Sequence, residues 1–341
     1  MSGDRRNRPP VPRLIGAPTE PLYRAVVARR NRAFDRGERV QRVTAPVISV
    51  GNLSVGGTGK TPVVAMIVSR LRDAGHTPGI AMRGYKAAPG SQSDEEREYR
   101  SSCPGVPVVA QPDRVAGATT LIERHACTCI VLDDGFQHRF LARDLDVVLL
   151  DATRDVFADR CLPAGWLREP VESLHRAQVA ILTHAETASD EAVATMSGTL
   201  RTRFPELTVV VTEHRWSAFI DLHGERREPE SLQKLEVILA SGIGNPSAFE
   251  AMARREGITV TNHMIMPDHH NWSVADLDRL NRLSGDLPVL TTRKDWVKIE
   301  RINHKLLDRI LVAEVAIRVR EGDAALREAI LNAARPAANG P

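Results

Sequence analysis

The chain has 341 residues, which is more than one hydrophobic core usually supports, so we expect two domains. Its composition, 42% hydrophobic and 26% charged, excludes a disordered or disulfide-framed chain and is typical of a soluble globular protein. No apolar run approaches the roughly 20 residues that span a bilayer, and the basic start lacks the apolar stretch of a secretory signal, so we expect a protein that is not exported.

Positive charge is concentrated at the N-terminus, where residues 1–42 carry eleven arginines against four acidic residues, although the net charge of the chain is only +3. Residues 1–21 are predicted to form a loose tail. Residues 20–36 have helical periodicity, with apolar positions at Leu22, Tyr23, Val26, Val27 and Phe34. Two interpretations remain open: a basic amphipathic helix on an anionic membrane surface, or a solvated arginine face whose apolar side packs on the body. Nucleic acid is not an expected partner, because only 4% of residues are aromatic and no stacking platform is evident.

From residue 46 onwards, short apolar runs alternate with segments of helical periodicity. This alternation predicts the α/β class, with a mostly parallel sheet flanked by helices. The first series contains strands over 47–50, 79–82, 106–110, 129–132, 147–150, 179–182 and 208–211, and helices over 61–74, 114–125 and 189–203. After a polar stretch, the second contains strands over 237–240, 259–266, 289–292 and 310–315, and helices over 246–256 and 274–283. We therefore predict a tail and helix over 1–45, a larger α/β domain over 46–222 and a smaller one over 223–335.

A phosphate-binding loop is predicted between the first strand and the helix after it. The loop consists of Ser54, Val55, Gly56, Gly57, Thr58, Gly59, Lys60 and Thr61. Its glycines allow backbone N–H groups to point at phosphate oxygens, and the helix adds the positive end of its dipole. Lys60 can reach the β- and γ-phosphates, and the Thr61 hydroxyl can bind Mg²⁺. The first position of this motif is usually glycine but here is Ser54. The domain over 46–222 is thus predicted to be a P-loop kinase domain.

An acidic pair follows the apolar strand over 129–132 and offers a second ligand for the metal. A carboxylate at the end of such a strand lies beside the phosphate loop, so Asp133 is the candidate, with Asp151 a weaker one. The alternative is that Asp133 and Asp134 only terminate the strand and form a turn. The four cysteines lack the spacing of a zinc or redox site, so we expect reduced structural thiols.

Together these segments resemble the tetraacyldisaccharide 4′-kinase family, in order and spacing from about residue 20 to 330. The motifs that carry the resemblance are VGNLSVGGTGKTP over 50–62, RGY over 83–85, DE over 94–95, DDGFQHR over 133–139, LPAG over 162–165, LREP over 167–170, SGIGNP over 241–246, DHH over 268–270 and TTRKD over 291–295. One departure is Arg293, where the family usually has a glutamate.

The resemblance implies two α/β domains with the active site in the cleft between them. It also implies ATP and Mg²⁺, and transfer of the γ-phosphate to the 4′-hydroxyl of an acylated glucosamine disaccharide 1-phosphate, a lipid A precursor. By resemblance, the protein is peripheral on the cytoplasmic face of the bacterial inner membrane, which residues 20–36 contact. No obligate protein partner is expected.

The resemblance further assigns roles to residues that the sequence pattern alone leaves unassigned. Asp94 and His269 are implied to act together on the acceptor hydroxyl, and Asp133, Asp134 and Glu169 to lie near the metal. From the pattern alone, Asp94 is one charge in an acidic loop and His269 a surface histidine. Two other functions stay open: a P-loop kinase of a soluble metabolite, and a nucleotide-switch ATPase or metallochaperone.

Overall fold

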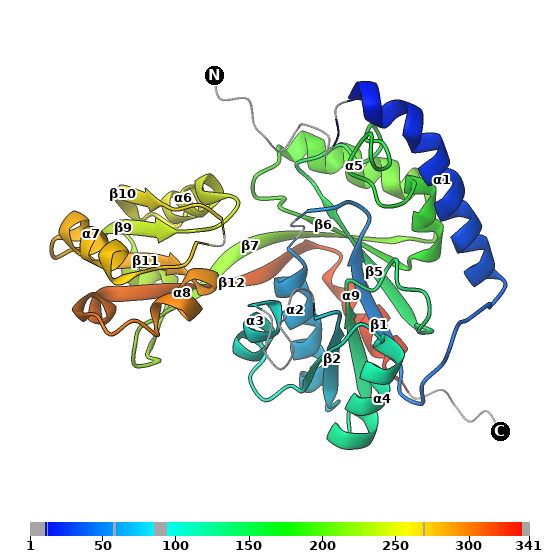
Figure 1. Cartoon of the computed structure of the whole chain (residues 1–341), viewed down its shortest axis with the longest axis horizontal. Coiled ribbons are helices and arrows are strands. Elements are labelled where there is room, and N and C mark those ends of the chain that lie inside the picture. Colours follow the sequence, from blue (N-terminus) through cyan, green and yellow to red (C-terminus); the bar gives the residue numbers. More distant parts are fainter. Residues whose placement is uncertain (1–10, 12, 57–58, 85–93, 269, 336–341) are drawn as a thin grey trace. The chain divides into compact units, whose positions relative to one another are not determined.

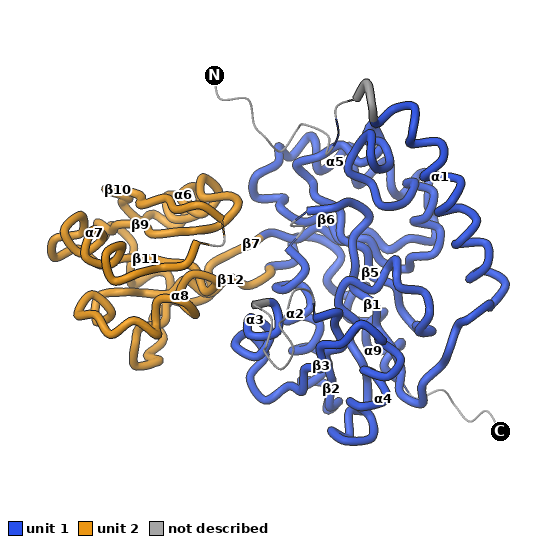
Figure 2. Tube along the Cα trace, in the orientation of Figure 1, with its two compact units in different colours: residues 1–213, 318–341 blue, residues 214–317 orange. Residues whose placement is uncertain are grey.

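The structure is a computed structural model that describes residues 11, 13–56, 59–84, 94–268 and 270–335 (Figure 1). The chain forms two compact units, which Figure 2 shows in different colours. The first unit holds residues 1–213 and 318–341, and the second holds residues 214–317. The chain leaves the first unit within strand β7 (Thr208–Ile220) and returns to it within strand β12 (Ile310–Glu321).

The first unit is built on a parallel sheet in which β6, β5, β1, β4, β2 and β3 are neighbours in that order, with the start of β7 beside β6. Their bounds are β1 Val47–Asn52, β2 Pro78–Met82, β3 Val108–Ala110, β4 Cys129–Asp133, β5 Leu145–Asp151 and β6 Val179–Thr183. Strands β1, β2, β4 and β6 are buried along their whole length, as expected for parallel strands covered on both faces. The predicted α/β class is confirmed.

The helices of the first unit are α1 Arg13–Asp35, α2 Lys60–Asp73, α3 Asp94–Ser102, α4 Arg114–His125, α5 Asp190–Arg203 and α9 Asp323–Ala333, with a 3₁₀ helix η2 over Val171–Arg176. Side-chain caps fix where two of them begin. Asp113 accepts hydrogen bonds from the first-turn amides of α4, and Ser189 does so for α5. Leucine and valine side chains of α5 join one core cluster with alternate residues of β5 and β6, and α4 joins another with β1 and β4.

Helix α1 begins at Arg13, so the predicted loose tail over residues 1–21 is wrong in its last part. The helix buries Val27 and Phe34, and leaves Leu22 and Val26 71% and 61% exposed. One apolar side of the helix therefore packs on the body, as the second interpretation predicts, and the membrane interpretation stays a prediction. Among the described helices, none is both long and apolar enough to cross a bilayer.

In the second unit, the strands β10, β9, β11 and β12 are parallel neighbours in that order, and α-helices connect them along the chain. The bounds are β9 Glu236–Ser241, α6 Pro246–Arg255, β10 Thr259–Ile265, α7 Val274–Ser284, β11 Val289–Thr292 and α8 Arg293–Ile299. A short β8 (Arg226–Arg227) pairs antiparallel with β7, and 3₁₀ helices η3 and η4 cover Pro229–Leu232 and Lys305–Arg309. The predicted alternation of strands and helices is confirmed here, although α8 was not predicted.

The observed units differ from the predicted domain boundaries at both ends of the second unit. The second unit begins at residue 214, within β7, and not at the polar stretch over 221–229, which holds the turn after β7 and the short strand β8. It ends at residue 317 and not at 335, since α9 belongs to the first unit. Leu326 and Ile330 of α9 are fully buried, and Asp323 pairs with Arg70 of α2. All four cysteines are buried and free, as predicted.

Candidate functional site

The predicted phosphate loop leaves the carboxyl end of β1 in a geometry that requires glycine at defined points. At Gly51 a Cβ atom would lie 2.7 Å from the backbone nitrogen of Phe136, so glycine allows β1 to pack closely on the loop that follows β4. Gly56 and Gly59 have φ angles of 121° and 73°, which disfavour other residues. Gly59 directly precedes α2, whose first residue is Lys60. Gly57 and Thr58 lie outside the described residues.

The start of the loop is fixed by backbone pairing with residues 166–168. Ser54 forms an isolated antiparallel bridge with Leu167. The Val55 N–H donates to the Trp166 carbonyl at 2.8 Å, and the Arg168 N–H donates to the Leu53 carbonyl at 2.8 Å. Because Ser54 is in an extended bridge without a positive φ angle, its replacement of the usual glycine costs no backbone strain.

Three charged side chains converge beside this loop. The Lys60 Nζ lies 3.2 Å from Asp134 Oδ1 and donates to Asn52 Oδ1 at 3.5 Å. The Arg168 Nη1 donates to both carboxylate oxygens of Asp134 at 2.9 Å. Burial acts to raise the pKa of Asp134, but Lys60 and Arg168 outweigh it and hold that pKa below its usual range. Asp134 therefore acts as the counter-ion of two cations.

Its neighbour Asp133, the last residue of β4, is in the opposite situation. It is 8% exposed, and its Oδ1 atom is buried without a hydrogen-bond partner among the described residues. Burial raises the pKa of Asp133 to about 6, and Lys60 opposes this only in part. The buried hydroxyl of Tyr99 in α3 lies next to the carboxyl of Asp133 and the hydroxyl of Thr61, but makes no hydrogen bond of good geometry.

These donors fit Mg²⁺. A buried carboxylate oxygen without a partner is costly, and a hard cation bound by oxygen ligands would satisfy it. Thr61 and Asp133 are the residues that would hold such an ion, while Asp134 is already engaged by Lys60 and Arg168. Within the described part of the chain, no three His, Cys, Asp or Glu side chains gather to hold a metal by themselves. An ion at this site would thus depend on nucleotide phosphates for most of its ligands.

Glu169, implied by resemblance to lie near the metal, has other partners here. Its side chain is fully buried, and Asn31 Nδ2 donates to Oε2 at 2.6 Å. Arg30 Nη2 lies 3.3 Å from Oε1, and Arg176 Nη1 lies 3.0 Å from Oε2. Two guanidinium groups thus balance the charge of this carboxylate, and an amide donates a hydrogen bond to it. These contacts give no support to a role as a metal ligand.

Two further polar residues near the acidic pair were missed by sequence reasoning. Arg114, the first residue of α4, is 5% exposed and lies close enough to Asp133 and Asp134 to interact with both charges. An arginine at the start of a helix gives no sequence signal of burial. His138 is adjacent to Arg114, and burial followed by the charges of Arg114 and Arg143 lowers the pKa of His138 to about 4. Its ring is therefore neutral near pH 7.

The two residues implied to act on the acceptor hydroxyl are not brought together by the described structure. Asp94 is the first residue of α3, but its side chain is outside what the structure describes, and His269 lies outside the described residues altogether. The assignment of the pair therefore stays a prediction. The residues next to His269 are held in place, since Lys294 Nζ donates to Asp268 Oδ1 at 2.8 Å and His270 Nε2 lies 3.1 Å from Asp276 Oδ2.

The TTRKD segment has a structural role in the second unit. Asp295 is fully buried and accepts hydrogen bonds from the Gly242 N–H at 3.0 Å, the Trp272 indole at 3.0 Å and the Thr292 hydroxyl at 2.7 Å. It thereby ties the turn after β9 to the start of α8. Arg293, at the position where an acid is usual, lies 4.0 Å from Glu314 of β12.

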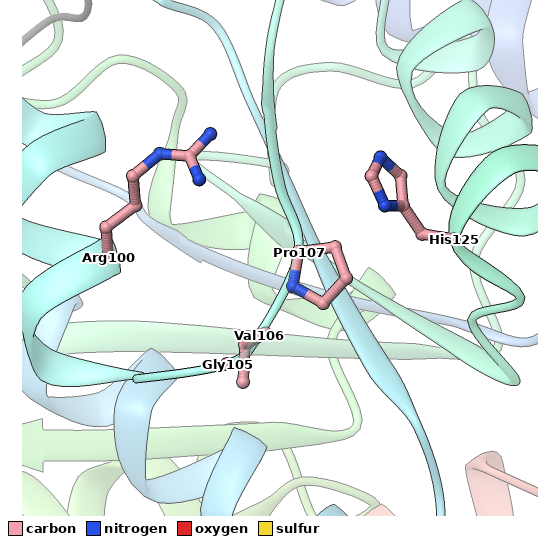
Figure 3. A pocket seen from close by; sticks show the side chains of 5 residues that line it. All are labelled: Arg100, Gly105, Val106, Pro107 and His125. Atoms are coloured by element: carbon pink, nitrogen blue, oxygen red, sulfur yellow. The ribbon is translucent and has the colours of Figure 1, made fainter.

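A separate cavity of about 300 Å³ lies near the ends of α3 and α4, lined by Arg100, Gly105, Val106, Pro107 and His125 (Figure 3). It is close to the amino end of β3, whereas the phosphate loop follows the carboxyl end of β1. Arg100 is already paired with Glu96 at 2.9 Å. This cavity therefore does not belong to the phosphate site.

The comparisons with known proteins agree with this geometry. The chain matches the family model described as "Tetraacyldisaccharide-1-P 4'-kinase" over residues 13–335. The tetraacyldisaccharide 4′-kinase of Anaeromyxobacter sp. (strain K) is 36% identical, covering 98% of this chain and 95% of that protein. The protein of the same name from Stenotrophomonas maltophilia (strain R551-3) is 38% identical, with 82% of each chain covered. A crystal structure of "apo" form LpxK from Aquifex aeolicus in complex with ATP superposes with a TM-score of 0.75, at 28% identity, over 94% of this chain and 98% of that chain.

We expect Asp133→Asn to stabilise the metal-free protein at about pH 8 by on the order of 1–2 kcal/mol, because it removes a buried charge whose desolvation the nearby cations offset only in part. The pKa of Asp133 is raised on folding to about 6, so its charge costs stability above that pH. The cost disappears as the pH falls below the ordinary aspartate value of about 4, and the difference from the parent should shrink accordingly.

Urea unfolding in the presence of a chelator, at about pH 8 and again below about pH 4, measures the difference in unfolding free energy between the variant and the parent. Asp73→Asn, an exposed aspartate at the end of α2, is the matched control and should change little. A variant at position 133 that is less stable than the parent at the higher pH would contradict the description of this site.

Proposed function

This chain belongs to the tetraacyldisaccharide-1-P 4′-kinase family, and from that premise we propose that it transfers the γ-phosphate of ATP to the 4′-hydroxyl of a tetraacyldisaccharide 1-phosphate. The observation that carries the proposal is the cluster of Lys60, Asp134 and Arg168 at the phosphate loop, beside Asp133, whose Oδ1 atom has no hydrogen-bond partner among the described residues. The product would carry a phosphate at each end of the disaccharide. The alternatives of a soluble-metabolite kinase and a nucleotide-switch ATPase are set aside by the family assignment.

Phosphoryl transfer depends mainly on positioning and on neutralising the charge of the migrating group. In this chain the N-terminus of α2 and the amides of the phosphate loop would bind the phosphates, and Lys60 would contact the terminal ones. Asp134 and Asn52 keep the Lys60 ammonium at the loop before nucleotide arrives. Such a preorganised cation stabilises developing charge without reorganisation during the reaction.

Mg²⁺ would be held by Thr61 and Asp133 together with the phosphates, and when bound it supplies further neutralisation of phosphate charge. A bound divalent cation would also favour the ionised form of Asp133 and so oppose the effect of burial on its pKa. Arg168 remains on Asp134 and adds positive charge at the rim of the site.

On the acceptor side, we assign Asp94 and His269 to the 4′-hydroxyl. A sugar hydroxyl has a pKa far above 7, so a base within hydrogen-bond reach accelerates its attack by roughly 10²–10⁴-fold. The assignment is supported by the family motifs and by the position of α3, since Tyr99 of the same helix lies next to Asp133 and Thr61. Helix α3 therefore begins near the phosphate site, as a residue acting on the acceptor requires.

We also propose that α1 rests on the cytoplasmic surface of the inner membrane, where an acylated substrate resides. The support is its outward face, where Leu22 and Val26 are exposed and the exposed Arg24 lies between them in the sequence. Exposed apolar side chains beside a basic side chain suit the boundary between acyl chains and anionic headgroups. The other face of the helix is anchored to the protein by Val27 and Phe34.

We expect Asp94→Ala and His269→Ala each to lower turnover by about tenfold or more while leaving ATP binding intact, because they act on the acceptor. Lys60→Ala should remove turnover and weaken ATP binding as well. The measurement is the transfer of labelled phosphate from ATP to tetraacyldisaccharide 1-phosphate, with ATP affinity determined in parallel. Near-normal turnover in a variant would show that the substituted residue does not have its assigned role. Asp73→Ala is the control and should keep the turnover of the parent.

The double variant Leu22→Ser with Val26→Ser should bind vesicles containing anionic lipid more weakly by about tenfold or more, because each substitution loses about 1 kcal/mol or more from the burial of an apolar side chain. Co-sedimentation measures the bound fraction. Leu235→Ser, at an exposed leucine of the second unit, is the matched control. Equal binding by the double variant and the parent would show that α1 is not the membrane contact.

A further inference from the structure

One segment of the first unit, residues 160–170, lies in contact with both α1 and the phosphate loop. On the side of the loop, the backbone of Trp166 and Arg168 pairs with residues 53–55 through two hydrogen bonds of 2.8 Å. The Arg168 guanidinium also donates to Asp134, the partner of Lys60. The position of this segment therefore sets where one of the two cations of the phosphate site lies.

The opposite side of the same segment is attached to α1 along several turns of the helix. A Cβ atom at Gly16 would lie 2.9 Å from the Cα of Ala164, which shows how closely the helix approaches. Glu20 accepts from the Cys161 N–H at 3.1 Å, and the Tyr23 hydroxyl donates to the Arg168 carbonyl at 2.8 Å. The contacts of Arg30 and Asn31 with Glu169 complete this row, so α1 contacts the segment from its start to its end.

Glu169 is the contact in this row with the largest energetic consequence. Its carboxylate is fully buried, and half of the cationic charge around it, the Arg30 guanidinium, comes from α1. Among the described contacts, Arg30 is the donor to Oε1 of this carboxylate, whereas Asn31 and Arg176 donate to Oε2. Removing Arg30 leaves a buried carboxylate oxygen without a hydrogen bond, which the surrounding segment can relieve only by moving. Because Glu169 and Arg168 are consecutive, such a movement displaces Arg168 from Asp134.

We infer that Arg30 and Asn31 of α1 are positioning residues for the nucleotide site, acting through Glu169 on Arg168 and thus on the Asp134–Lys60 pair. The inference rests on the proposed function for the identity of the nucleotide. It gives α1 a second role, since its outward face contacts the membrane and its inward face supports phosphate binding. It also makes Glu169 part of the helix anchor and not a ligand of the metal.

The two roles of Glu169 lead to different behaviour of nucleotide binding. A metal ligand affects binding only when Mg²⁺ is present, and residues of α1 that touch no metal would not share its effect. A positioning role affects binding with or without Mg²⁺, because Lys60, which the Asp134–Arg168 pair holds in place, would contact phosphates and not the ion. In that case Arg30→Ala and Asn31→Ala should reproduce the effect of Glu169→Gln.

The experiment titrates the full-length, lipid-free protein with a fluorescent ATP analogue, once with excess Mg²⁺ and once with a chelator. We expect Arg30→Ala and Asn31→Ala to raise the Kd by about fivefold or more in both conditions, leaving the ratio of the two Kd values unchanged. Arg29→Ala is the matched control: it removes the same charge from the adjacent, exposed position of α1, and it should stay within about twofold of the parent.

Tyr23→Phe tests the same contact with a milder change, in case the other variants fail to fold. It removes one hydrogen bond to the Arg168 carbonyl and leaves no buried charge without a partner. It should raise the Kd by about threefold in both conditions. Three results would overturn the inference. The Kd values of the Arg30, Asn31 and Tyr23 variants could all lie within about twofold of that of the parent. The loss of affinity could be confined to the titration with Mg²⁺, or Arg29→Ala could lose as much affinity as Arg30→Ala. A parent protein that does not bind the analogue would instead overturn the proposed function.

Discussion

The phosphate site depends on a single carboxylate that holds two cations together. Asp134 pairs with Lys60 at 3.2 Å and with Arg168 at 2.9 Å, and these two side chains come from elements far apart in the sequence. Without the carboxylate, the two partly buried positive charges would repel each other. With it, the cluster keeps a net positive charge and a fixed geometry, which is what an incoming triphosphate requires.

The adjacent residues Asp133 and Asp134 show how environment separates the roles of two identical side chains. Asp134 is neutralised by protein cations, so its pKa is lowered and it has no need of a metal. Burial raises the pKa of Asp133 to about 6, and a metal would bind its Oδ1 atom, which has no hydrogen-bond partner in the part of the chain that the structure describes. The pattern of two acids after a strand identifies the pair, but only the surroundings show which acid is available for an ion.

The sequence predicts the parts of the site that are local in the chain. The phosphate loop, Lys60, and an acid at the end of β4 follow from residue types at fixed spacing beside apolar runs, and the order of strands and helices follows from periodicity. It does not predict the burial of Arg114 or Tyr99, or the anchoring of Glu169 by α1, because these depend on contacts between distant segments. The return of α9 to the first unit was missed for the same reason, since its apolar pattern does not indicate which sheet it covers.

A calorimetric titration of Mg²⁺-bound ATP into the purified, lipid-free chain tests the central claim most directly. If the cluster around Asp134 is a preformed phosphate site, one equivalent binds per chain, and the affinity falls as salt is added, because charge attraction contributes to binding. The absence of saturable binding would contradict the claim that this cluster is a phosphate site. Lys60 would then have no phosphate to contact, and α1 would have no nucleotide site to support.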